Sequence, residues 1–181
     1  ANGGKLTLRN ITINGGANDP SSSNIATNST YATGKAKGPI VLVQSGGTMN
    51  ITDGAVLENN SNEPDMSNNK LVISGYIGMG GAVHCNGTLT MTGGTIRNCE
   101  AQCGGGVYVE NGTFYMSGGT IDNNYARDIV SYRNRMENYH KNAGGGVYVS
   151  TASTFKMEGG TISNNTAKSA GGVYFLRCNA E

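Results

Sequence analysis

The sequence predicts an all-β fold, a parallel β-solenoid in which each repeat of about 25 residues forms one turn of a coil, which we call a rung. Composition, an internal repeat and the length of that repeat lead to this prediction. The 181 residues include 29 Gly and 23 Asn, which are poor helix formers, so a helical bundle is excluded. The net charge of +1 gives no electrostatic basis for binding nucleic acid, and no apolar stretch is long enough to insert into a membrane.

One motif occurs three times with little change, at residues 80–98, 104–123 and 144–164. Each copy has a Gly-Gly-x-Val segment, a Thr-x-x-Met segment, a Gly-Gly-Thr-Ile segment and an Asn. A further copy begins at Gly171, and more divergent copies span residues 41–59 and 6–14. Ile96 and Ile121 lie 25 residues apart, and Ile162 follows after 41, which is one period plus about 16 inserted residues.

Each element of the repeat has a physical reason. In the first strand, the aligned valines are predicted to stack in the core: Val83, Val107, Val147 and Val173. In the second, alternation places two columns inward: Leu89, Phe114 and Phe155, and Met91, Met116 and Met157. The Gly pairs are expected at corners between strands. With no room for a helical crossover, consecutive rungs must pair their strands in parallel.

The Asn that closes each repeat has two interpretations. Asn98, Asn123 and Asn164 either form a ladder of side-chain amides from rung to rung or reflect only the preference of Asn for turns. Arg97 and Asp122 occupy equivalent positions and are predicted to form an ion pair between rungs.

Three rungs carry insertions at one corner, at about residues 16–37, 62–78 and 127–142. The first is expected to be an irregular loop and the second a short strand or hairpin. The third has Ile129, Tyr132 and Met136 at helical spacing and predicts a helix that faces the coil. This helix either caps an apolar patch or presents a basic, tyrosine-bearing contact to a ligand, through Tyr132, Arg133 and Arg135.

The pattern GGGVYV…GTF.M.GGTI.NN resembles the right-handed parallel β-helix repeats of bacterial surface proteins, which abound in gut Firmicutes. In style it is also similar to chlamydial polymorphic outer-membrane proteins, whose first signature half matches Gly80–Val83, whereas the F-x-x-N half is absent. The resemblance covers residues 38–175 and, more weakly, 4–16. It implies a right-handed, single-stranded parallel β-helix of five to six rungs, an adhesin-like role and an extracellular or cell-surface location.

The chain is predicted to be one β-helix domain over residues 1–181 and a fragment of a longer protein with flanking domains. The last repeat stops after one strand, so Phe175 and Leu176 would leave an apolar end uncovered.

One column of rings next to the valines is the candidate binding site. Because the valines face inward, the adjacent residues are expected to face solvent as a strip suited to an extended glycan: His84, Tyr108, Tyr148 and Tyr174. The alternative is that these rings stack on one another or are covered by the third insertion. Regular threonine columns also leave ice binding open as a function, although threonine is common on exposed strands.

No catalytic or metal-binding constellation is apparent. The carboxylates are scattered, and the four cysteines show neither a C-x-x-C pair nor clustered histidines, so no metal or cofactor is expected. Cys99 and Cys103 either form a local disulfide or remain free thiols. The sequence therefore favours a non-catalytic, adhesin-like or glycan-binding stalk. The alternatives are an accessory or catalytic β-helix of a polysaccharide-degrading lyase or glycosidase, and a spacer without a ligand.

Overall fold

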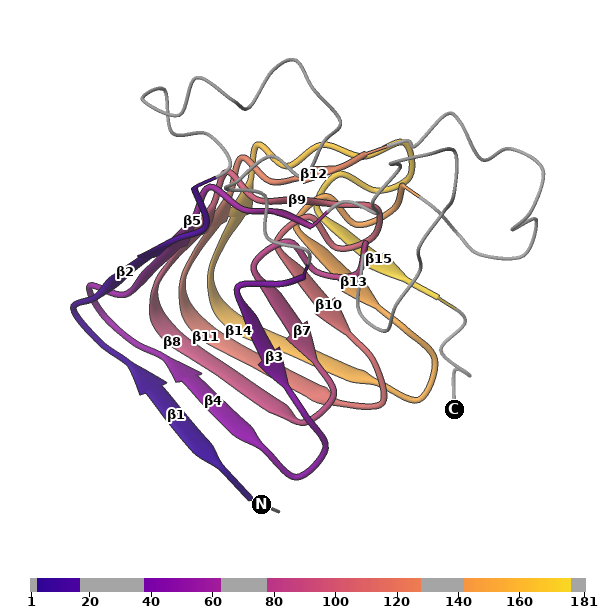
Figure 1. Cartoon of the computed structure of the whole chain (residues 1–181). Helices are drawn as coiled ribbons and strands as arrows, with labels where there is room; N and C mark the ends of the chain where they lie inside the picture. The colour runs from indigo at the N-terminus through magenta and orange to yellow at the C-terminus, as the bar shows by residue number, and fades with distance from the viewer. Residues whose placement is uncertain (1–2, 17–37, 63–77, 128–141, 177–181) are drawn as a thin grey trace, which may run out of the picture.

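The computed structural model describes residues 3–16, 38–62, 78–127 and 142–176 of the chain (Figure 1). These residues contain β-strands and turns and no helix. The strands form three sheets in which all pairs are parallel. The predicted all-β fold is therefore confirmed.

The strands fall into three sheets that run the length of the coil. The long sheet contains β1 (Lys5–Leu8), β2 (Thr12–Asn14), β4 (Thr48–Ile51), β5 (Val56–Glu58), β8 (Thr88–Arg97), β11 (Thr113–Asp122) and β14 (Thr154–Ser163). The valine sheet contains β3 (Val41–Val43), β7 (Val83–Cys85), β10 (Val107–Val109), β13 (Val147–Val149) and β15 (Val173–Phe175). The short sheet contains β6 (Ser61–Asn62), β9 (Glu100–Ala101) and β12 (Tyr125–Ala126).

The order of the sheets along the chain makes the molecule a parallel β-helix. In one rung the chain passes from β7 in the valine sheet to β8 in the long sheet and β9 in the short sheet, and the next rung repeats this order with β10, β11 and β12. In Figure 1 equivalent strands lie side by side from the N-terminal to the C-terminal end. Among the described residues, the first rung has strands in the long sheet only, and the last has only β15.

The core contains the columns that the repeat predicts. Val83, Val107 and Val147 pair in register and are fully buried, and Val173 is partly buried at the end of the column. Phe114 pairs with Leu89 on one side and Phe155 on the other, and the two phenylalanine rings lie 5.0 Å apart. The predicted stacking of the repeat is thus confirmed.

The Gly-Gly pairs that precede the valines lie at bends between strands, as expected, with positive φ at Gly80, Gly104 and Gly144. The pairs of the Gly-Gly-Thr-Ile segments differ from this predicted role. They do not separate two strands, because β8, β11 and β14 each run for ten residues through the pair. A shift in the pairing register marks a bulge there instead, between Met116 and Thr120. Gly119 has φ +87°, and a Cβ at this position would lie 2.5 Å from the carbonyl oxygen of Gly93. Glycine therefore lets the long strand bend while two rungs stay in close contact.

The predicted insertions lie largely outside the described residues. The ranges 17–37, 63–77 and 128–141 fall between β2 and β3, β6 and β7, and β12 and β13. The helix expected around Ile129, Tyr132 and Met136, and the strand or hairpin expected around residues 71–77, therefore remain predictions.

Candidate functional site

The predicted ring column exists in the valine sheet. Tyr108 pairs with His84 on one side and Tyr148 on the other, and Tyr148 pairs with Tyr174. Tyr108 and Tyr148 are stacked with ring centroids 4.9 Å apart, and Tyr148 and Tyr174 with centroids 5.1 Å apart. His84 meets Tyr108 edge to face at 5.0 Å. The repeat therefore brings all four rings together, as expected.

The expected exposure of this column is wrong. Tyr108 is 7% exposed and Tyr148 is 3% exposed, His84 is fully buried and Tyr174 is half-buried. The two buried tyrosines form a second apolar cluster with Ala143, against which other side chains pack: Met79, Cys103, Tyr174 and Leu176. The valine sheet is thus covered on both faces, because the rings stack and the bridged segments at Met79, Cys103 and Ala143 lie beside them. Binding by these residues stays a prediction, but an open strip of ring faces is not present.

His84 has an acidic neighbour at the end of this column. Its Nε2 lies 3.1 Å from Oε2 of Glu110, which is partly exposed. Burial lowers the pKa of His84 and outweighs the opposite effect of the Glu110 carboxylate. The carboxylate and the edge-to-face contact with Tyr108 together hold the imidazole in place, which is a structural role.

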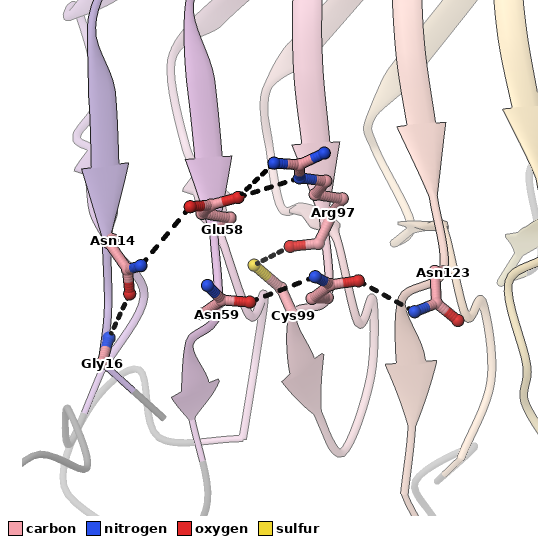
Figure 2. Close-up of polar contacts among 8 residues, drawn as sticks. Asn14, Gly16, Glu58, Asn59, Arg97, Cys99 and Asn123 are labelled. Carbon is pink, nitrogen blue, oxygen red and sulfur yellow. Dashed lines mark hydrogen bonds and ion pairs between the residues drawn. The ribbon is translucent and has the colours of Figure 1, made fainter. Parts of the chain in front are cut away.

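A polar ladder follows the corner after the long sheet (Figure 2). Nδ2 of Asn98 donates to Oδ1 of Asn59 at 3.1 Å, and Nδ2 of Asn123 donates to Oδ1 of Asn98 at 2.8 Å. The ladder was one of two interpretations of these residues and is confirmed for this part. The next member differs, because Asn164 donates to the carboxylate of Asp122 at 2.8 Å. These asparagines also share positive φ angles of about 50–55°, as at Asn98 with φ 54°, so turn preference and ladder act together.

A second asparagine column, one residue further along, was missed by the sequence analysis. The Asn124 side chain is buried, accepts the N–H of Cys99 at 3.0 Å and donates to the carbonyl of Ile96 at 3.2 Å. Asn165 repeats the donation to the carbonyl of Ile121 at 2.9 Å, and Asn60 donates to the carbonyl of Gly81 at 2.7 Å. The recurring Asn-Asn pair was the available signal. This column satisfies backbone groups inside the corner.

The predicted pair of Arg97 with Asp122 is wrong. Arg97 binds Glu58 of the preceding rung instead, with Nη2 2.7 Å and Nε 2.8 Å from Oε2 (Figure 2). Asp122 accepts from Oγ of Ser163 at 2.8 Å, in addition to Asn164. The register places Arg97 beside both acids. The sequence of one repeat does not show whether Arg97 pairs with the acid of the preceding rung or with that of the following rung.

Two further carboxylates are engaged in ion pairs. Glu100 binds Arg127 at 2.9 Å, and Glu158 binds Lys156 at 2.7 Å on the surface. Lys156 lowers the pKa of Glu158 by hydrogen bonding and charge. Each of these acids thus has a cationic or hydrogen-bonding partner, an arrangement typical of structural pairs.

The outer side of the long sheet presents a polar surface with one exposed ring. Tyr115, in β11, is 44% exposed. It pairs in register with Thr90 and Lys156 on the neighbouring strands. On its own strand, Thr113 and Ser117 face outward on either side of it. We call this surface the Tyr115 face: Thr88, Thr90, Thr113, Tyr115, Ser117, Thr154 and Lys156. Its signal in the sequence was the alternation of Phe114 and Met116 inward with Tyr115 outward.

The remaining predictions concern the basic insertion, the cysteines, metal sites and membrane spans. Tyr132, Arg133 and Arg135 lie outside the described residues. Cys99 and Cys103 are not joined by a disulfide, so the alternative of a local bridge between them is wrong. In the part of the chain that the structure describes, no cluster of three histidine, cysteine or acidic side chains could hold a metal ion, and no helix is long and apolar enough to span a bilayer.

Comparisons with known proteins add no relative. No protein-family model matches the chain, and neither the curated proteins nor the solved structures give a match.

Proposed function

We propose that this chain is a non-catalytic β-helix module of a bacterial cell-surface protein, a stalk that binds an extended glycan weakly through the Tyr115 face. The observation that carries the proposal is an exposed aromatic ring in register with hydroxyl and amine groups on neighbouring strands. The resemblance of the repeats to those of bacterial surface proteins supports the location.

The described core suits a stalk. Each rung forms parallel backbone pairs with the next, and its apolar columns are buried throughout the middle of the coil. Two columns of asparagine side chains add hydrogen bonds between rungs at the same corner. Hydrogen bonds between polar groups inside the coil favour one arrangement of the chain, so we expect the coil to hold its shape under load.

The chemistry of the Tyr115 face suits sugars. An aromatic ring offers a rigid apolar surface for the C–H face of a pyranose, and the surrounding threonines and Lys156 supply donors and acceptors. Rungs repeat at about 4.8 Å, so the hydroxyls of Thr88, Thr113 and Thr154, which pair in register, recur along the direction in which an extended chain would lie. A shallow surface buries little of each sugar, and we expect a dissociation constant near ~1 mM, about −4 kcal/mol.

A glycan titration followed by NMR tests the proposal. Tyr115→Ala is expected to weaken binding about tenfold, equivalent to ~1.4 kcal/mol, whereas Tyr115→Phe keeps the ring and should bind nearly as well as wild type. The matched control is Tyr125→Ala, because Tyr125 is 40% exposed but lies in the short sheet. Equal binding by Tyr115→Ala and Tyr125→Ala contradicts the assignment of the site.

The second candidate function is a spacer without a ligand. The closed ring column favours it, because the largest aromatic cluster in the described residues contributes to packing and presents little surface. Absence of binding to a broad panel of bacterial and host glycans would select this function. A lyase or glycosidase remains an alternative from the sequence alone, and the engaged carboxylates give it no support.

A further inference from the structure

An ion pair accompanies the exposed ring of the Tyr115 face. Nζ of Lys156 lies 2.7 Å from Oε1 of Glu158, two residues further along β14, and both side chains are exposed. Tyr115 pairs in register with Lys156. Glu158 raises the pKa of Lys156 by a hydrogen bond, and Tyr115 adds a smaller electrostatic contribution. A cation, an anion and an aromatic ring are therefore neighbours on one surface.

The bulge in the long sheet explains why the two charged side chains meet. β14 pairs with β11 residue by residue through Met157, and the next paired residue of β14 is Gly159. The register thus passes over Glu158, which is the extra residue of the bulge. A bulge re-aims the side chain of the residue that it adds, and here the carboxylate lies against Lys156. Both side chains lie on the outer side of the sheet, so a further rung beside β14 would leave them on the surface.

The strands beside this ion pair present a neutral outer surface. Before the bulge, the outward residues of β4, β8 and β11, which belong to the described part of the chain, are all uncharged: Thr48, Asn50, Thr88, Thr90, Thr92, Thr113, Tyr115 and Ser117. On β14 the outward charges are Lys156 and Glu158, and they neutralise each other. A ligand that lies across these strands therefore meets hydroxyls, an amide and one ring, but no net charge.

We propose that Lys156 and Glu158 together determine the specificity of the Tyr115 face, so that its ligand is an uncharged, linear polysaccharide. This inference rests on the proposed function and names the class of glycan. The ammonium group that a sugar carboxylate would bind is already bound to a protein carboxylate. A second carboxylate beside it meets the like charge of Glu158 and loses part of its hydration, and both effects disfavour an anionic glycan. A neutral glycan has neither cost, and its hydroxyls bond to both charged groups.

A matched pair of oligosaccharides in NMR titrations tests the proposal. Cellohexaose is neutral, and the glucuronan hexamer has the same β-1,4 backbone with a carboxylate at C6 of each sugar. Wild type is expected to bind the glucuronan hexamer about threefold more weakly than cellohexaose, or weaker still. Glu158→Gln keeps the size and polarity of the side chain and frees the ammonium group of Lys156. Its affinity for the glucuronan hexamer should rise about fivefold, the effect of one exposed charge at about 4 Å, and its affinity for cellohexaose should stay within about twofold.

Two control variants connect this change to the ion pair. Lys156→Met/Glu158→Gln removes the ammonium group as well, so the gain in glucuronan binding should disappear. Glu100→Gln removes the carboxylate of a similar ion pair, with Arg127 in the short sheet, and should bind both probes like wild type. High salt should also weaken the gain of Glu158→Gln, because exposed charges are screened. Lys156 and Glu158 are exposed, so both of their variants are expected to keep the fold by circular dichroism.

The outcomes separate this inference from the proposed function. If wild type binds the glucuronan hexamer at least as tightly as cellohexaose, or if Glu158→Gln leaves the preference unchanged, the inference is wrong. In that case, weaker glycan binding by Tyr115→Ala still supports the proposed function. If only the acidic members of a broad glycan panel bind wild type, the inference is likewise wrong and the glycan site stands. If no member of the panel binds, both are wrong.

Discussion

The buried amide of Asn124 provides the sharpest test of how the corner is stabilised. Asn124→Ala removes an acceptor from the N–H of Cys99 and a donor from the carbonyl of Ile96. It also removes the contact of Nδ2 with Oδ1 of Asn165, at 3.0 Å, although that oxygen still accepts the backbone N–H of Asn124 at 2.9 Å. Two backbone groups in the interior thus lose their side-chain partner.

The expected loss follows from the cost of leaving such groups unsatisfied. A buried donor or acceptor without a partner costs about 1–3 kcal/mol. Two groups close together do not add fully, so we expect Asn124→Ala to lower the free energy of unfolding by about 2–4 kcal/mol. Free energies of unfolding of about 5–15 kcal/mol are usual for protein domains, so the loss expected from this single substitution is a large fraction of the total stability.

Urea denaturation followed by tyrosine fluorescence and circular dichroism measures this loss. With a slope of about 2 kcal/mol per molar, the midpoint should fall by roughly 1–2 M. The matched control is Asn123→Gly, in the exposed ladder, which loses the bond to Asn98 but keeps a residue suited to φ 51°. This control should change stability by no more than about 0.5 kcal/mol. A loss below ~1 kcal/mol for Asn124→Ala, or an equal loss for both variants, refutes the reasoning.

Two further predictions concern buried titratable groups. Burial lowers the pKa of His84 below 6.5, so just below that pH the unfolded chain binds more protons than the folded chain. The free energy of unfolding should therefore fall as the pH is lowered through 6.5 and level off below the pKa of the folded state. His84→Tyr, which extends the tyrosine column, should remove this part of the pH dependence in urea titrations from pH 7.5 to 5, and an unchanged slope contradicts the assignment. Burial raises the pKa of the Cys99 thiol to about 12 and also raises that of Cys85. In a Cys178→Ser background, iodoacetamide at pH 8 should therefore label half-buried Cys103 first, and equal labelling rates for all three contradict this.

The repeat allowed much of the fold to be predicted. Side chains alternate along a strand, and every rung meets neighbours of the same kind, so the inward columns through Val107, Phe114 and Met116 followed from alignment alone. The same reasoning placed the asparagine ladder at the correct corner. It failed only at the Gly-Gly pair inside the long strand, because a bulge within a strand and a corner between two strands require the same residue type.

The candidate site was less accessible to sequence reasoning. Alternation correctly placed Tyr108 on the opposite side from the valines, but it says nothing about what covers that side. Met79, Cys103 and Ala143 come from segments beyond the short sheet and pack beside the rings. By contrast, the outer side of β11 has no such cover at Tyr115. Tyr108 and Tyr115 both point away from the core, but only Tyr108 is covered by side chains from other segments, and this explains their different exposure.

By itself, the sequence determined the parallel coil, its period and the residues that face its interior, since these depend on local alternation and on contacts between identical positions. Only the tertiary structure decided which outward residues reach solvent and which charged group each acid meets. Those outcomes depend on chain segments outside the repeat and on the choice between two equivalent neighbours, as for Arg97 between Glu58 and Asp122. A one-dimensional pattern does not distinguish such neighbours, because both lie one rung away.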